Sequence, residues 1–394
     1  MNFRSHITAA LVLTATLLAL SACAPTIRIK RLKPARVNAA AHLSKITVLT
    51  FEGQGGERLS SRLKEALEDI YVDGEPYFSI VGEDTFYKLA SSQKCGACRG
   101  EKHILSLAAA TGADAVLAGS VTQDSCTAEL YEKKETRCIR RTILEKNENP
   151  VCTQWADFFI PCVRNTATYE FEVRLVEIET GQYLYTDSFG STRQNRACLR
   201  NRHTGSYRAS LIELTDSRLA SRQCRAEWKR DLINRAYEDA VARAEKKITR
   251  NIAPYYESAK IPIMTSAAGI SDAKSKTLFT RAIKLAKNRN LTKACTLWKE
   301  AGTMNPDAPS LNYNLGVCAE FKNELGRAEE LYRRSAALLG GANDMMLAAF
   351  KRIDRNKKDM NVLERQLDEQ SKNRNRKKTK RPLPRPGAQE GTTK

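Results

Sequence analysis

The sequence predicts an α+β fold in which a mixed-sheet domain is followed by a small all-α helical domain. Two observations predict this class. Up to about residue 255, short β-branched or alternating segments lie between segments with helical periodicity, as in a sheet packed with helices. From Ala273 onward only helical periodicity remains, and matching residues such as Ala294 and Ala328 stand 34 positions apart.

A short apolar run near the N-terminus precedes Cys23. It extends from Ile7 to Leu20, about fourteen residues, which fits the apolar region of a secretory signal (about 7–15 residues) better than a membrane-spanning helix (roughly 20). Leu20-Ser21-Ala22-Cys23 resembles the lipobox of bacterial lipoprotein signals. We therefore expect residues 1–22 to be a signal peptide and Cys23 to be the acylated first mature residue. An ordinary cleaved signal with a chance cysteine is the alternative.

The residue after Cys23 bears on the location of the protein. It is Ala24, and in lipoproteins of this type the absence of aspartate there implies transfer to the outer membrane. Two or three acyl chains hold a protein firmly, because one chain alone binds a membrane only marginally. We expect a lipid-anchored protein on the outer membrane, facing the periplasm.

The first domain is expected at residues 43–255, after a linker at 23–42. Leu59, Leu63 and Leu67 recur at helical spacing, whereas apolar residues from Tyr169 to Leu175 alternate with charged ones, as in a strand with one solvated face. The expected strands are 45–51, 77–81, 113–122, 169–175 and 183–189, and the expected helices are 59–70, 83–92, 103–111 and 227–252.

The glycines in Gly53-Gln54-Gly55-Gly56 follow the first strand. A phosphate-binding loop requires Gly-x-Gly-x-x-Gly or Gly-x-x-x-x-Gly-Lys-Ser/Thr at this position, and neither spacing is present. We interpret the segment as a turn.

Several segments of this domain, in order, carry a resemblance to a known family. "KITVLTF", "YFSIV", "TGADAVLAGSVTQ" and "TYEFEVRLVEIETGQYLYTDSFGS" resemble the core of the curli-secretion channel lipoproteins (the CsgG family). The resemblance covers roughly residues 43–255 and implies an outer-membrane lipoprotein with a mixed sheet. In the curli channel, two insertions form amphipathic hairpins that join those of other subunits into a transmembrane barrel.

The corresponding insertions here, at about 124–167 and 190–226, have a different composition. Segments such as "EKKETRCIRR" lack the alternation of apolar residues that a lipid-facing strand needs over about ten positions. We therefore expect soluble, disulfide-stapled loops that contact another molecule, and no pore.

Besides Cys23 the chain has ten cysteines, an even number in a compartment where disulfides form. Proximity in sequence predicts the pairs Cys295–Cys318, Cys198–Cys224, Cys152–Cys162 and Cys126–Cys138. Cys95 and Cys98 stand three apart, as a structural, idle or redox-active pair. No second pair of matching spacing and no placed histidine completes a zinc site, and Arg99 stands where c-type haem attachment needs histidine. No metal or cofactor is expected.

The second domain, at residues 273–365 after a linker at 256–272, resembles tetratricopeptide repeats. Leu315-Gly316 sits where the first helix of such a repeat carries its Leu-Gly pair. The helix around 345–353 is expected as a cap, because two repeats are fewer than the usual three. A plain pair of helical hairpins is the alternative. Such repeats imply binding of partner peptides on the concave side. The residues that match at the 34-residue period are Ala294 with Ala328, Trp298 with Tyr332, Ala301 with Ser335, and Pro306 with Gly340.

The formal net charge is +20, and much of it lies in a C-terminal tail, residues 366–394, that we expect to be disordered. Anionic lipid head groups, lipopolysaccharide or peptidoglycan carboxylates suit such a tail in the periplasm, and a nucleic-acid partner does not. A solvated tail without a partner is the alternative.

No catalytic pattern is present, since none of the four histidines has a recognisable catalytic neighbourhood. We expect a non-enzymatic scaffold, or an assembly or regulatory factor, for an envelope machine of secretion or cell-wall synthesis, with envelope protein partners and homo-oligomers as an option. A channel subunit built like the curli proteins is the alternative. The histidines are His6, His42, His103 and His203.

Overall fold

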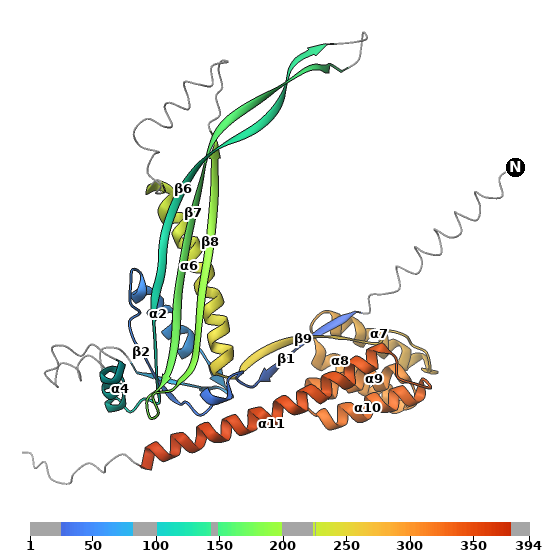
Figure 1. Ribbon diagram of the computed structural model, residues 1–394. Helices are drawn as coiled ribbons and strands as arrows, with labels where there is room; N and C mark the ends of the chain where they lie inside the picture. The colour runs from blue at the N-terminus through green and yellow to red at the C-terminus, as the bar shows by residue number, and fades with distance from the viewer. Residues whose placement is uncertain (1–24, 82–100, 143–148, 199–223, 225, 380–394) are drawn as a thin grey trace, which may run out of the picture. The chain divides into compact units, whose positions relative to one another are not determined.

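The computed structural model describes residues 25–81, 101–142, 149–198, 224 and 226–379 (Figure 1). The predictions for Cys23, Cys95, Cys98 and the helix at 83–92 lie outside these residues. The chain divides into two compact units. One comprises Met1–Ala35 with Pro254–Asp368 and is called the helical unit, and the other comprises Arg36–Ala253 with Glu369–Lys394 and is called the sheet unit. The α+β class predicted from the sequence is confirmed.

The sheet unit contains a five-stranded mixed sheet of order β5-β2-β6-β7-β8. β2 is parallel to β5 and β6, whereas β6, β7 and β8 pair antiparallel. The elements are η1 (Asn38–Ala40), β2 (Lys45–Val48), α2 (Gly56–Glu68), β3 (Tyr71–Val72), β4 (Glu75–Pro76), β5 (Ser79–Val81), α4 (Glu101–Ala110), β6 (Ala115–Thr142), β7 (Val151–Glu177), β8 (Tyr183–Cys198) and α6 (Ala226–Ile252).

The first predicted insertion is not a set of loops. β6 and β7 are 28 and 27 residues long and stay paired from Ala115–Glu177 to Thr142–Val151, so residues 124–142 and 151–167 continue the sheet. β8 likewise extends into the second predicted insertion as far as Cys198. A two-stranded ribbon with solvent on both faces can form from charged residues and needs no apolar face. The lack of apolar alternation therefore did not exclude strands, and the expectation of loops was wrong.

Helix α6 packs lengthwise against β7 and β8 (Figure 1). Its predicted stripe is buried from Leu232 through Ala236 and Ala240 to Ile248. Alanines at four-residue intervals let the helix axis approach the sheet, where Tyr169 and Phe171 fill the space. This interface forms the core of the sheet unit.

The helical unit combines two antiparallel helix pairs with a two-stranded ribbon. The elements are β1 (Thr26–Lys33), β9 (Tyr255–Pro262), α7 (Ala273–Lys287), α8 (Leu291–Met304), α9 (Pro309–Phe321), α10 (Leu325–Leu338) and α11 (Asp344–Thr379), of which the part up to Asp368 belongs to this unit. Trp298 and Tyr332, the large residues at matching repeat positions, are fully buried.

Two segments predicted as linkers, 23–42 and 256–272, contain the paired strands β1 and β9. Ile27, Ile29 and Ile261 alternate with polar residues and pack in one core with Phe279 and Trp298. The strands pair across more than two hundred residues of sequence, so neither could be recognised as half of a ribbon by itself.

Helix α11 extends further than predicted. The expected tail begins at residue 366, but the helix continues to Thr379 and buries Gln366, Gln370 and Asn373. In the sheet unit, Gln370 donates to the carbonyls of Leu43 and Tyr77, at 2.8 and 3.0 Å. Amide side chains on one face of the helix, together with Arg374, donate to backbone carbonyls, while Lys372 and Arg376 are exposed. These hydrogen bonds order a segment that has few apolar residues.

Candidate functional site

The outer part of the β6–β7 pair is a two-stranded ribbon that we call the arm, residues 131–142 and 151–162. β8 ends at Cys198, directly opposite Cys162, and beyond this point β6 and β7 pair alone. Figure 1 shows both strands extending past β8 and past α6. An isolated two-stranded ribbon is marginally stable in water, so the arm needs additional constraints.

Disulfides supply those constraints at both ends of the arm. Cys162–Cys198 ties its base to β8, with Cα atoms 4.0 Å apart, and Cys138–Cys152 ties its two strands together near the tip, with Cα atoms 5.8 Å apart. Each bond closes a ring that limits fraying of the unpaired ribbon. The arm is therefore held extended without a covering helix.

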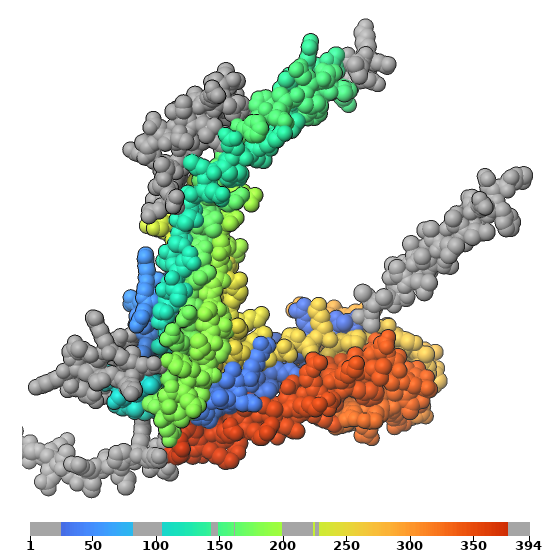
Figure 2. Space-filling model, viewed as in Figure 1, coloured from blue at the N-terminus to red at the C-terminus, as the bar shows by residue number. Residues whose placement is uncertain are grey.

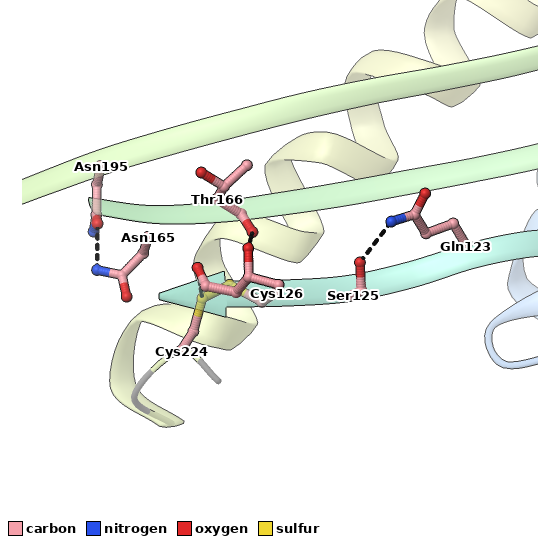
Figure 3. The surroundings of a disulfide bond; sticks show 8 residues. Gln123, Ser125, Cys126, Asn165, Thr166, Asn195 and Cys224 are labelled. Atoms are coloured by element: carbon pink, nitrogen blue, oxygen red, sulfur yellow. Dashed lines mark hydrogen bonds between the residues drawn. A yellow bond between two sulfur atoms is a disulfide. The ribbon is translucent and has the colours of Figure 1, made fainter. Parts of the chain in front are cut away.

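A third disulfide, Cys126–Cys224, joins β6 to the residue just before α6 (Figure 3), with Cα atoms 5.4 Å apart. Cys224 N also donates to Cys126 O at 3.3 Å. Both cysteines are buried beside Ala167 and Leu232. The N-terminal end of α6 is thereby fixed to the sheet below the arm.

The predicted pairs Cys126–Cys138, Cys152–Cys162 and Cys198–Cys224 are wrong. In long antiparallel strands the cysteine nearest in space lies across the ladder and not along it, as Cys162 opposite Cys198 shows. In the helical unit the structure joins Cys295 of α8 to Cys318 of α9, Cα atoms 5.7 Å apart, which is the pair expected from the helical repeat.

Aromatic side chains are exposed on the arm. Trp155 is 62% exposed and Phe159 is 52% exposed. Between them on the same face of β7, Asp157 accepts from Lys134 and Thr136, each at 2.7 Å, and these hydrogen bonds, that from Lys134 foremost, lower the pKa of Asp157. On the face that Figure 2 shows, none of the described helices lies over the arm. Exposed aromatic residues on a constrained scaffold are typical of interaction surfaces.

In the helical unit the segment that follows β9 lies against α9, one of the helices that were expected to bind peptides. Asn314 of α9 donates to Met264 O and accepts from Met264 N, both at 2.9 Å. Most residues of α9 are buried. An extended segment of the chain itself therefore occupies this face.

A buried ion-pair network holds the ribbon to the helices. Glu320 is 1% exposed and contacts Arg31 at 2.5 Å and Arg352 at 2.6 Å, and it accepts from Tyr332 at 2.7 Å. Burial acts to raise the pKa of Glu320, but the hydrogen bond and charge of Arg352, together with the charge of Arg31, outweigh it and lower that pKa. The network is structural, since every group in it belongs to the core.

The sheet unit also contains a cavity of about 510 Å³ between the Gly-rich turn, β6, β7 and the first turns of α6. Burial raises the pKa of the Tyr169 and Tyr237 hydroxyls, and burial also raises the pKa of Asp124 against the charge of Lys229. The lining residues are Gln54, Gly55, Arg58, Asp124, Tyr169, Lys229, Arg230, Ile233, Asn234 and Tyr237.

None of the four histidines was assigned to a site from the sequence, and the structure describes the side chain of His42 alone among them. His42 Nε2 lies 2.8 Å from Glu177 Oε1, His6 and His203 lie outside the described residues, and the side chain of His103 is not described. Within the part of the chain that the structure describes, no group of three or more His, Cys, Asp or Glu residues is placed to hold a metal ion. None of the described helices has both the length and the apolar character needed to span a membrane.

Sequence reasoning missed Trp155 and Phe159, which lie in the first predicted insertion. The only signal was the recurrence of aromatic residues in "TQWADFFI", which strand periodicity places partly on one face. It also missed the cavity, because its residues come from four separate segments.

No protein-family model and no curated protein matches the sequence. Among solved structures the chain is similar to the LpoB C-terminal domain from Salmonella enterica, 10% identical, with 37% of this chain and 81% of that one covered and a TM-score of 0.23. Lipoprotein GNA1162 from Neisseria meningitidis is 14% identical over 44% of this chain and 99% of its own, with a TM-score of 0.23. The PelC dodecamer from Paraburkholderia phytofirmans is 12% identical, with 58% of this chain and 99% of the PelC chain covered and a TM-score of 0.21. TM-scores this low transfer no function to this chain.

Proposed function

We propose that the protein is a non-enzymatic scaffold of the bacterial envelope, an outer-membrane lipoprotein that assembles or regulates a machine for secretion or cell-wall synthesis. The observation that carries this proposal is the arm. It presents Trp155 and Phe159 to solvent from a ribbon that disulfides tie at its base and near its tip. A constrained element loses little conformational entropy when it binds, which favours contact with a protein partner.

The anchoring part of the proposal is supported by the N-terminal strand. Cys23 precedes Thr26, the first residue of β1, by three positions, which span at most about 10 Å. Arg28 and Lys30 on β1 and Lys260 opposite Arg28 on β9 share the exposed face of the ribbon. If Cys23 is acylated, this face of the ribbon is tethered close to the membrane, and each of its cations that comes within a Debye length of anionic head groups contributes about 1 kcal/mol to binding.

The helical unit is proposed as a second protein-binding element. Because Arg31 of β1 and the segment around Met264 contact α9, a partner is proposed to contact other faces of this unit, where Leu338, Leu339 and Leu347 are exposed. The basic tail is proposed to adhere weakly to lipopolysaccharide or peptidoglycan, in a salt-sensitive manner.

The arm also bears on the alternative function, a channel subunit. It is a hairpin, as in the curli proteins, but Lys133 and Lys134 are adjacent residues and so place charge on both of its faces. Neither face is therefore an apolar band that could contact lipid. The scaffold is the function that the arm favours.

The experiment compares proteins cross-linked to the acylated wild-type chain in intact envelopes with those cross-linked to a Trp155→Ser, Phe159→Ser double variant. The control is Tyr71→Ser, an exposed aromatic residue of β3. We expect specific cross-linked species to disappear only in the arm variant. An unchanged set would contradict the proposal, and a symmetric ring with a central hole in negative-stain images would replace it with the channel.

A further inference from the structure

The Gly-rich turn of the sheet unit places the start of a helix at the cavity wall. Gly53 and Gly55 have φ angles of +92° and +79°, which favour glycine, and α2 begins at Gly56 with Gly55 as its N-cap residue. Among the described residues no side-chain hydrogen bond caps this helix end, Gly56 N donates to Gly53 O at 3.2 Å, and Glu57 stands in the first turn. The first turn of a helix carries backbone N–H groups without intrahelical partners and a partial positive charge, and both attract anions.

Two buried tyrosine side chains line the same cavity. Tyr169 and Tyr237 are 2% and 3% exposed, their rings pack edge to face at 5.2 Å, and neither hydroxyl has a hydrogen-bond partner among the described residues. A Cβ added to Gly55 would lie 3.7 Å from the Tyr169 hydroxyl, so this hydroxyl lies beside the N-cap of α2. Buried polar groups are nearly always hydrogen-bonded, so two neighbouring buried hydroxyls without a hydrogen-bond partner require an explanation. Since burial raises both pKa values, each hydroxyl keeps its proton and is a donor.

The charged residues around the cavity favour an anion with one hydrogen to donate. Lys229 and Arg230 line the first turns of α6, and Arg58 lies over the Tyr237 ring, with Cζ 4.0 Å from the centroid. Arg58 also forms an ion pair with Glu238 at 2.6 Å, and this carboxylate partly neutralises the charge of Arg58. Asp124 is the one acidic residue in the lining, and its Oδ1 has no hydrogen-bond partner in the described part of the chain.

From this arrangement we propose that the cavity binds a phosphate group. The N-terminus of α2, the two tyrosine hydroxyls and the cations of α6 bind its oxygens, while Asp124 accepts the hydrogen that hydrogenphosphate carries near neutral pH. A sulfate of the same size has no hydrogen to offer and meets the carboxylate as a like charge. The cavity volume of about 510 Å³ leaves room for a group esterified to the phosphate. This site is independent of the scaffold proposed above.

The test is calorimetric titration, at constant ionic strength, of residues 23–394 expressed without the expected signal peptide and carrying Cys23→Ser, so that no acyl chain is attached. Inorganic phosphate should bind saturably, and sulfate at least about tenfold more weakly. Glycerol 3-phosphate tests a lipid-type source of the same group, and both ligands are compared near pH 6, where about half of a phosphate monoester still carries the hydrogen that Asp124 accepts. Tighter binding than inorganic phosphate would identify an esterified ligand, and weaker binding would identify the free ion.

Isosteric variants distinguish specific binding of phosphate in the cavity from the non-specific attraction of anions to a positively charged protein. Tyr169→Phe and Tyr237→Phe should each weaken phosphate binding about tenfold without changing Tm, whereas Tyr185→Phe, whose hydroxyl bonds to Asp187 outside the cavity, should not. Asp124→Asn should bring sulfate binding close to that of phosphate. Equal affinity for both anions in the wild-type chain, or unchanged affinity in both phenylalanine variants, would show an adventitious ion only and overturn the proposal.

Discussion

Cys162 of β7 lies directly opposite Cys198 of β8, and their disulfide stands where the three antiparallel strands become two. This bond is at the base of the arm, and Cys138–Cys152 lies toward its tip. Together they let a ribbon rich in charge remain extended beyond the helix that covers the rest of the sheet.

The disulfide connectivity can be read directly from the oxidised protein. We expect non-reducing peptide mapping to recover four bonds, because in each the Cα atoms lie within bonding reach and the elements are paired or packed. Recovery of a bond between Cys126 and Cys138, or of Cys162 as a free thiol, would contradict the strand register. The bonds are Cys126–Cys224, Cys138–Cys152, Cys162–Cys198 and Cys295–Cys318.

Removing the bond near the tip should loosen the arm alone. Cys138 and Cys152 are 14 residues apart, and a ring of that size stabilises by about 3 kcal/mol. In a Cys138→Ser, Cys152→Ser variant we expect amide hydrogen exchange to accelerate in residues 131–142 and 151–162 while the β7–β8 region keeps its protection. Uniform protection across both regions would show that the arm is stable without this bond.

Acylation is tested at Cys23. Because the thiol is the proposed attachment point, Cys23→Ala should leave the precursor uncleaved and without lipid, whereas Cys95→Ala should be processed normally. Intact-mass spectrometry of membrane-extracted protein distinguishes the two. A normally processed Cys23→Ala protein would exclude the lipoprotein proposal and would leave the phosphate site untouched.

The buried carboxylate of Glu320 should control the acid stability of the helical unit. Its pKa is lowered in the folded state, so its contribution to stability is present above the ordinary pKa of 4.5 and is lost as pH falls below that value through the folded pKa. Glu320→Gln removes one partner of a buried network and should cost roughly 3–5 kcal/mol at neutral pH. It should also flatten the loss of stability below pH 4.5.

The matched control for Glu320 is Glu329→Gln. Glu329 pairs with Lys357 and Arg333 at a solvated position, so its loss should change stability by less than about 1 kcal/mol. Chemical denaturation at several pH values measures both variants. Equal effects of the two substitutions would show that the Glu320 network is no stronger than a surface pair.

The end of α11 should stabilise the sheet unit through its amide side chains. Asn373 donates to His42 O at 2.9 Å and to Asp114 Oδ1 at 2.8 Å. Asn373→Ala leaves these buried acceptors short of a donor and should cost about 1–3 kcal/mol, whereas the exposed Ser371→Ala should change little. Thermal unfolding checks both, and equal midpoints would mean that this part of α11 does not support the sheet unit.

Local patterns in the sequence determined the fold class, the helices α2, α6 and α7 to α10, and the proximity of Cys295 to Cys318. Helical periodicity depends on residues three and four apart, and two helices joined by a short turn pack as neighbours, so these features need no distant information.

Only the tertiary structure decided the continuation of β6 and β7 through the first insertion, the three disulfides of the sheet unit, and the pairing of β1 with β9. It also decided the docking of α11 and the cavity beside Gly55. Each depends on strand register or on contacts between segments far apart in the chain, as in the pairing of Arg28 with Lys260. The free energy that selects such contacts comes from burial and hydrogen bonding across the ladder, which a one-dimensional pattern of charge and hydrophobicity does not specify.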